Sequence, residues 1–209
     1  MKNILCYGDS NTWGYIPVTG GRYPLSVRWT GVAAQALGPD YRVLEEGLSG
    51  RTTVFDSPFN PELNGKSHLA CALMTHAPLD LAVLMLGTND LQHRHCAYDA
   101  AAGSAALARM ILASPACFTG GKPRVLLVSP ILVGANIRDV NFTPIREHGH
   151  EESLLFAAHY LRMADKLGVD FLDAAAYASP SELDAEHMTA EGHAALGAAI
   201  AEKITQILG

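Results

Sequence analysis

The amino-acid sequence predicts an α/β protein in which helices cover both faces of a parallel β-sheet. Two observations lead to this prediction. Five short apolar segments alternate with longer segments whose apolar residues recur at helical spacing, which is the pattern of a doubly wound sheet. Four of the five segments are nearly continuous apolar runs, as is typical of parallel strands buried on both faces. Right-handed crossovers between such strands give a three-layer α/β/α sandwich.

The composition is that of a compact globular protein. The chain has 209 residues, of which 49% are hydrophobic and 17% are charged, so we expect a single domain over residues 1–209. The net charge of -6 argues against nucleic-acid binding. The apolar runs are too short to span a bilayer, and the N-terminus lacks the pattern of a signal peptide. The four cysteines form no C-x-x-C pair, so we expect reduced thiols and a cytoplasmic protein without a membrane partner.

Five segments bounded by turn residues are predicted as β-strands. They are Asn3–Tyr7, Tyr41–Leu44, Leu79–Leu86, Arg124–Ser129 and Val169–Leu172. Gly8 lets the backbone turn sharply after the first strand, which places Ser10 at that strand's carboxyl end. In an open α/β sheet the carboxyl ends of the strands form the edge at which ligands bind. Polar residues that follow different strands are therefore expected to converge there.

Five segments between or after the strands are predicted as helices. They are Val27–Leu37, Leu69–His76, Ala97–Ala113, Glu151–Leu167 and a final helix that Thr189 caps. Gly38 and Gly168 follow the first and fourth of these at the positions where helices usually end. Two connections are long, namely Tyr15–Ser26 and Val133–Gly149, and we expect them to wall a pocket or to mediate self-association.

The residues after the strands include those that acyl transfer requires. A serine hydroxyl is a weak nucleophile that needs an adjacent base, and a carboxylate orients a histidine base. Ser10 follows the first strand, while Asp184 and His187 follow the fifth and are close enough in sequence to point the same way. The backbone N–H groups of Ser10 and Gly50 and the side-chain amide of Asn89 can supply the donors of an oxyanion hole.

Each of these pieces alone has an ordinary structural explanation, because Gly, Asp and Ser favour turns and an Asp-x-x-His segment is usually surface decoration. Only their ordered combination favours catalysis. The alternative from another class is a non-enzymatic protein that binds a phosphate or a flavin at Asp9–Thr12. That alternative does not account for Asn89 or for the Asp184 and His187 pair.

No metal and no cofactor are expected from the sequence. His93 and His95 are separated by one residue, so on an extended segment they can share one face. No cysteine or carboxylate follows at a spacing that supports a zinc site. No dinucleotide-binding or P-loop motif occurs. We expect His93 and Trp13 to line a substrate pocket, and Asp9 to lie beside it or to hydrogen-bond its own turn. Asp90 is expected to support the loop that presents Asn89.

The sequence resembles the SGNH (GDSL) hydrolase family. Four blocks carry the resemblance, namely Gly8-Asp9-Ser10, Ser49-Gly50, Gly87-Thr88-Asn89-Asp90 and Asp184-Ala185-Glu186-His187. The resemblance implies a flavodoxin-like, five-stranded parallel sheet of order 2-1-3-4-5. It also implies a serine esterase in which Ser10 is the nucleophile, His187 is the base and Asp184 orients the base. Ser10, Gly50 and Asn89 would form the oxyanion hole.

A closer likeness is to bacterial arylesterases of this family that transfer acyl groups to alcohols, and to its carbohydrate acetylesterases. The segments 8–14, 27–31, 45–49 and 63–65 carry it. It implies hydrolysis of small, acetyl-like esters through an acyl-enzyme, with aryl esters or acetylated carbohydrates as substrates and acyl transfer to alcohols as a second reaction. It also implies a homo-oligomer such as an octamer. Some of these relatives carry alanine at the position of Gly50.

Overall fold

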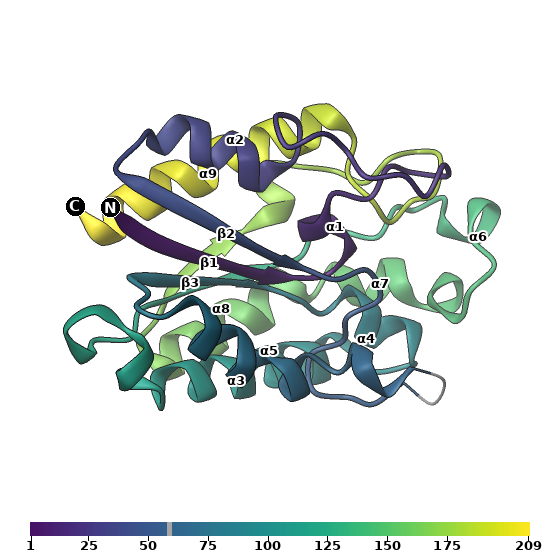
Figure 1. Cartoon of the computed structure of the whole chain (residues 1–209). Helices are drawn as coiled ribbons and strands as arrows, with labels where there is room; N and C mark the ends of the chain where they lie inside the picture. The colour runs from purple at the N-terminus through teal and green to yellow at the C-terminus, as the bar shows by residue number, and fades with distance from the viewer. Residues whose placement is uncertain (58–59) are drawn as a thin grey trace.

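The computed structural model describes residues 1–57 and 60–209 and contains one parallel sheet in the order β2-β1-β3-β4-β5 (Figure 1). Its strands are β1 Lys2–Gly8, β2 Tyr41–Gly47, β3 Leu81–Met85, β4 Val125–Ser129 and β5 Asp170–Asp173. Every neighbouring pair of strands is parallel. The predicted fold class and the predicted strand order are therefore confirmed.

Helices cover both faces of the sheet. They are α1 Ser10–Trp13, α2 Trp29–Leu37, α3 Gly65–His76, α4 Thr88–Gln92, α5 Ala97–Leu112, α6 Ile137–Val140, α7 Gly149–Ser153, α8 Phe156–Leu167 and α9 Ala190–Leu208. Short 3-10 turns occur at Pro61–Leu63, Pro115–Cys117, Thr119–Gly121, Pro144–Glu147 and Ala174–Ala176. Figure 1 shows α2 and α9 on one face and α3, α5 and α8 on the other, with both termini at the end of the sheet opposite α1.

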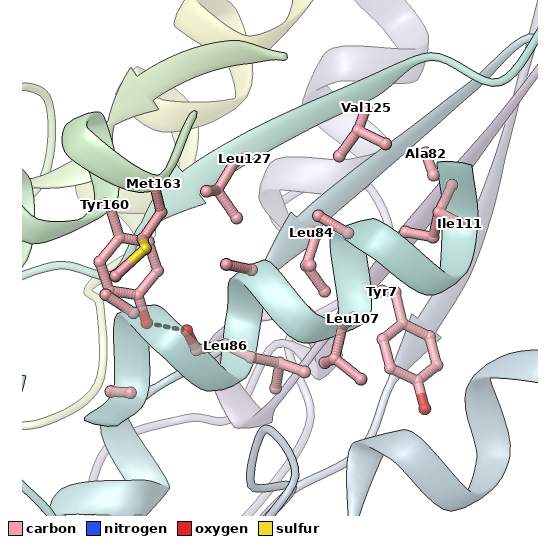
Figure 2. Packing of buried hydrophobic residues seen from close by; sticks show 14 of the residues in the cluster. Tyr7, Ala82, Leu84, Leu86, Leu107, Ile111, Val125, Leu127, Tyr160 and Met163 are labelled. Atoms are coloured by element: carbon pink, nitrogen blue, oxygen red, sulfur yellow. Dashed lines mark hydrogen bonds between the residues drawn. The ribbon is translucent and has the colours of Figure 1, made fainter. Parts of the chain in front are cut away.

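The two faces of the sheet form separate cores because successive side chains of a strand point to opposite sides. From β1, Leu5 and Tyr7 face α3, α5 and α8, whereas Ile4 and Cys6 face α2 and α9. Figure 2 shows the first core, in which the hydroxyl of Tyr160 donates to the carbonyl of Leu86 at 2.6 Å. Since β1, β3 and β4 are buried on both faces, their apolar runs are recognisable in the sequence.

The predicted helix Glu151–Leu167 is wrong in one respect, because it is two helices. The chain leaves α7 after Ser153, and Leu154 and Leu155 are 56% and 47% exposed between α7 and α8. The hydroxyl of Ser153 accepts the backbone N–H of Val133 at 2.9 Å, which fixes α7 against another segment. Burial of Phe156 fixes α8 against the sheet. The break cannot be recognised in the sequence, because the apolar residues keep helical spacing across it.

The predicted second strand, Tyr41–Leu44, is too short, because β2 continues to Gly47. In the sequence, the polar residues Glu45 and Glu46 interrupt the apolar pattern of this strand. The carboxylate of Glu45 is paired in the fold with the guanidinium of Arg28, at 2.9 Å from Nε and 2.8 Å from Nη2. A half-buried carboxylate with such a partner can remain in a strand. A side chain on Gly47 would lie 2.2 Å from the backbone nitrogen of Trp13, so this glycine lets α1 pack against the end of β2.

A fully buried histidine links α9 to α2. The Nδ1 atom of His193 accepts the backbone N–H of Trp29 at 3.3 Å, and the ring of Tyr23 meets the imidazole edge-on at 5.3 Å. Burial, together with the nearby charges of His187 and Arg28, lowers the pKa of His193 to about 4. The imidazole is therefore neutral in the folded protein at neutral pH.

His193 makes the stability depend on pH. Its pKa is about 4 when folded and 6.5 when unfolded, so the unfolded chain binds the proton more tightly. The contribution is fully present above pH 6.5 and is lost as the pH falls toward 4. Between pH 7.5 and pH 5 the wild type should lose about 2 kcal/mol more free energy of unfolding than His193→Asn, as measured by urea denaturation. Equal losses in both proteins would show that His193 does not titrate in this way.

Candidate active site

Ser10 stands at the start of α1, directly beyond the carboxyl end of β1. The carboxylate of Asp9 caps the turn by accepting the backbone N–H of Asn11 at 3.0 Å. Gly14, with φ of 90°, ends this single turn of helix, and its N–H donates to the carbonyl of Ser10 at 2.8 Å. Ser10 is 7% exposed. The turn thus holds the serine hydroxyl at the edge of the sheet, and Asp9 hydrogen-bonds its own turn as expected.

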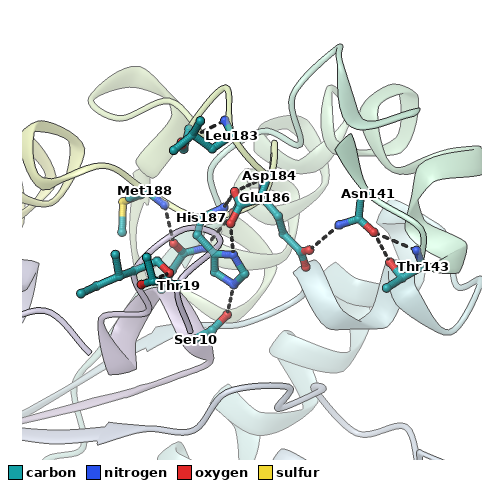
Figure 3. Close-up of polar contacts among 12 residues, drawn as sticks. Ser10, Thr19, Asn141, Thr143, Leu183, Asp184, Glu186, His187 and Met188 are labelled. Atoms are coloured by element: carbon teal, nitrogen blue, oxygen red, sulfur yellow. Dashed lines mark hydrogen bonds and ion pairs between the residues drawn. The ribbon is translucent and has the colours of Figure 1, made fainter. Parts of the chain in front are cut away.

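Three of the predicted site residues meet in a line (Figure 3). The Nε2 atom of His187 lies 2.9 Å from Oγ of Ser10, and Nδ1 lies 2.9 Å from Oδ2 of Asp184. An ionised carboxylate can only accept hydrogen bonds, so the proton of the neutral imidazole belongs on Nδ1. The lone pair of Nε2 then faces the hydroxyl of Ser10. This arrangement can withdraw a proton from the serine.

The electrostatics of the site make the imidazole of His187 a stronger base than a free histidine. Burial disfavours the imidazolium, but the hydrogen bond to Asp184 and the charges of Glu186, Asp184 and Asp9 outweigh it and raise the pKa of His187 above its ordinary value. Burial alone would raise the pKa of the Asp184 carboxyl. Its hydrogen bonds with the side chain and backbone of His187 outweigh burial and lower that pKa. The pair is therefore arranged so that the imidazole can accept the proton of Ser10 while the carboxylate of Asp184 stays ionised.

Two residues that sequence reasoning missed hold His187 in place. The side chain of Asn11 accepts the N–H of Met188 at 3.0 Å and donates to the carbonyl of Glu186 at 3.2 Å, so it contacts both neighbours of His187. The ring of Tyr15 stacks on the imidazole, with centroids 4.2 Å apart. Asn11 follows Ser10 directly, but asparagine is common in turns. Nothing in the local sequence indicates a partner so distant in the chain.

The other predicted donors lie on loops joined by Arg51. The amide of Asn89, on α4, donates to the carbonyl of Arg51 at 3.1 Å, and Gly50 adopts φ of 84° just before it. The guanidinium of Arg51 donates to the carbonyl of Gly8 at 3.0 Å and covers the ring of Tyr7 at 4.0 Å. Arg51 thus connects the loops that follow β1, β2 and β3. Because an amide nitrogen carries two hydrogens, Asn89 keeps a second donor.

Asp90 lies next to Asn89 on α4 and not on a loop, and it binds the loop that follows β2. Its buried carboxylate accepts the backbone N–H of Thr53 at 3.1 Å and also bonds the hydroxyl of Thr53. Burial raises the pKa of Asp90 to about 7, against the lowering effect of these hydrogen bonds. Burial likewise raises the pKa of Asp9 to about 6. Two carboxyl groups with unusual pKa values therefore lie next to the serine and the asparagine in the chain.

The predicted pocket residues Trp13 and His93 lie farther out. Trp13 is half-buried, and the guanidinium of Arg22 lies 5.2 Å from the centre of its ring. His93 follows α4, where burial and the neighbouring His95 lower its pKa. Their role in a substrate pocket stays a prediction. Within residues 1–57 and 60–209, no group of three or more His, Cys, Asp or Glu side chains is arranged to hold a metal ion.

Both long connections contact the turn that carries His187. Tyr15 begins the first connection and stacks on the imidazole. In the second, the N–H of Gly134 donates to the carbonyl of Ala185 at 2.7 Å, and the amide of Asn141 donates to the carboxylate of Glu186 at 3.2 Å. These segments therefore border the site, and whether they wall a pocket stays a prediction. In the described part of the chain, no helix is long and apolar enough to cross a membrane.

Solved structures of esterases resemble this chain over nearly its whole length. A search of curated proteins gives no match. The solved structure of an aryl esterase from M. smegmatis in inhibitor-bound form is 39% identical, with each chain covered 100% and a TM-score of 0.90. A carbohydrate acetylesterase from Sinorhizobium meliloti is 38% identical, with 99% of this chain and 100% of that chain covered and a TM-score of 0.92.

A third solved structure is described as a putative arylesterase from Agrobacterium tumefaciens. It is 37% identical, each chain is covered 100%, and the TM-score is 0.88. The model of the GDSL-like lipase/acylhydrolase family matches residues 6–195. This match includes all four blocks of site residues at the carboxyl ends of the strands. The chain therefore belongs to the GDSL-like lipase/acylhydrolase family and is a carboxylic ester hydrolase.

Proposed function

We propose that the protein is a serine esterase that works through an acyl-enzyme, with Ser10 as nucleophile, His187 as base and Asp184 as the residue that orients the base. The observation that carries this proposal is the continuous line from the Ser10 hydroxyl through the imidazole to the Asp184 carboxylate, with 2.9 Å at each contact. A serine next to an oriented imidazole is the arrangement that activates a hydroxyl for attack on an ester carbonyl.

The proposed reaction has two halves. Oγ of Ser10 attacks the ester carbonyl while Nε2 of His187 takes the hydroxyl proton, and the same proton then goes to the leaving alcohol as its C–O bond breaks. Water next loses a proton to His187 and attacks the acyl-serine, which releases the acid and restores the hydroxyl. Asp184 stabilises the imidazolium in both halves. An alcohol in place of water would receive the acyl group, which is the proposed transfer reaction.

The negative charge on the carbonyl oxygen requires donors fixed in advance. We assign this role to the backbone N–H groups of Ser10 and Gly50 and to the amide of Asn89. The bond from Asn89 to Arg51 supports the assignment, because it ties that amide to the residue next to Gly50. The bond from Arg51 to Gly8 ties both to the strand that ends beside Ser10.

Small acyl esters are the proposed substrates, with aryl esters and acetylated carbohydrates as the candidate classes. The low exposure of Ser10, 7%, and the ring of Tyr15 against His187 support a small acyl group. The solved relatives include an aryl esterase and a carbohydrate acetylesterase. The buried carboxylate of Asp9 disfavours the phosphate-binding alternative, because it would repel an anion at the turn after β1.

A homo-oligomer is also proposed. The segments that border the site carry exposed apolar side chains, with Val18 69%, Phe142 86% and Leu183 65% exposed. Large apolar side chains exposed on the segments around one site favour an interface with another protein chain. Light scattering tests this proposal, and a monomer at micromolar concentration would contradict it.

Loss of Ser10 or of His187 should nearly abolish activity. We expect Ser10→Ala and His187→Ala each to lower kcat on p-nitrophenyl acetate by at least about 10³-fold, and the double variant to be little worse, because the two act as a unit. Ser114→Ala, at the far end of α5, is the control and should keep the wild-type rate. Full turnover by Ser10→Ala would remove this serine from the mechanism.

Asn89→Ala should mainly lower kcat, by about 10²–10³-fold, with little change in KM, because the lost donor acts on charge that develops in the transition state. Asn3→Ala is a matched control, since the amide of Asn3 also donates to a backbone carbonyl, that of Pro78 at 2.8 Å, at the opposite end of the sheet. Steady-state kinetics separate the two constants. An unchanged kcat in a folded Asn89→Ala protein would rule out the oxyanion role.

The acyl-chain profile tests the substrate proposal. Across p-nitrophenyl esters from acetyl to octanoyl, kcat/KM should be highest for acetyl and should fall as the chain lengthens, because Ser10 is nearly buried. Acetylated sugars measured in parallel distinguish the two candidate classes. A maximum at octanoyl would contradict the assignment to small acyl groups.

A further inference from the structure

The proposed mechanism leaves one buried carboxylate beside the base unused. Glu186 immediately precedes His187 and is 7% exposed. Burial raises the pKa of the Glu186 carboxyl, while the nearby charge of His187 and two hydrogen bonds oppose this effect. A carboxylate out of water is costly unless hydrogen bonds replace its hydration. Its position therefore requires an explanation.

The carboxylate of Glu186 joins two separate segments. Oε1 accepts Nε2 of Gln92 at 3.0 Å, and Oε2 accepts Nδ2 of Asn141 at 3.2 Å. Gln92 is the last residue of α4, which also carries Asn89. Asn141 belongs to the long connection 133–149, where its own oxygen accepts the N–H of Thr143 at 2.8 Å. Figure 3 shows the side chain of Glu186 extending toward Asn141 while His187 extends toward Ser10.

The backbone of the same turn is held from other directions. Ala185 adopts φ of 59°, a left-handed conformation that is unfavourable for a residue with a side chain. Its carbonyl accepts the N–H of Gly134 at 2.7 Å. The carbonyl of Glu186 accepts the amide of Asn11 at 3.2 Å. With the backbone held in this way, the Glu186 carboxylate is the side chain that links the turn to α4.

We propose that Glu186 is a positioning residue for His187, whose carboxylate couples the base to the helix carrying Asn89 and to the segment 133–149. This inference rests on the proposed function of Ser10 and His187. The carboxylate has no bond to the imidazole. It acts by fixing the turn and by its charge.

The charged surroundings of His187 come from three elements. Asp184 and Glu186 lie on its own turn, Asp9 lies at the end of β1, and His193 lies on α9 and is neutral. Asp184 is hydrogen-bonded to the imidazole of His187, and the uncharged ring of Tyr15 stacks on that imidazole. Removing the charge of Glu186 should therefore make His187 easier to deprotonate without removing its partner.

Glu186→Gln tests the charge. The acid limb of the kcat/KM profile should move to lower pH by about half a unit to one unit, the scale expected for losing one nearby charge in a partly buried site. Glu186→Asp keeps the charge, so its acid limb should stay at the wild-type pH even if the rate falls. Glu182→Gln, which removes an exposed carboxylate in the same segment, is the matched control. It should change neither the rate nor the pH of the acid limb.

Gln92→Ala and Asn141→Ala test the coupling and do not depend on the folding of Glu186→Gln. Each should lower kcat by about tenfold with little change in KM, because a displaced base loses its alignment with the hydroxyl. Combining Gln92→Ala with Glu186→Ala should cost less than the sum of the separate effects, since both remove the same contact. Wild-type kcat in both amide variants would overturn the coupling.

Two patterns of results separate this inference from the proposed function. If Ser10→Ala keeps full activity, the proposed function fails and the inference fails with it. If Ser10→Ala is inactive while Glu186→Gln has the wild-type rate and the wild-type pH profile, only the role of Glu186 is refuted. A downward shift of the acid limb in Glu186→Gln alone, together with slower amide variants, supports the role.

Discussion

The hydrogen bond between the Ser10 hydroxyl and the imidazole of His187 joins residues 177 positions apart, and the rest of the site depends on it. A parallel sheet makes this possible, because every strand delivers its carboxyl end to the same edge. β1 brings Ser10 there, β3 brings Asn89, and the chain beyond β5 returns with His187. The packed helices and cores contribute to this hydrogen bond by keeping those strand ends in fixed positions.

Buried polar contacts then convert proximity into geometry. Asn11 contacts both neighbours of His187, Arg51 joins three loops, and Asp90 holds Thr53. Polar groups that have left water are costly when a partner is missing, so such contacts resist small displacements. The same burial shifts the pKa values of several acids and of His187. The structural network and the electrostatics of the site are therefore one arrangement, and Glu186 belongs to it.

Much of the fold and of the candidate site could be predicted from the sequence, because the signals are local. Apolar runs followed by glycine or proline mark the buried strands, and Ser10 and His187 lie in short motifs beyond the strand ends. What could not be predicted depends on distant partners. The length of β2 requires Arg28 to pair with Glu45, and the roles of Asn11 and Tyr15 exist only where the turn around His187 folds back against α1.

The most direct test of the account is to identify the residue that an ester-like electrophile modifies. After reaction with a fluorophosphonate, peptide mass spectrometry should locate one adduct per chain, on Ser10, and labelling should be far slower in His187→Ala because the hydroxyl has lost its base. A stoichiometric adduct on another residue would contradict the central claim. So would continued ester hydrolysis by protein whose Ser10 is fully labelled.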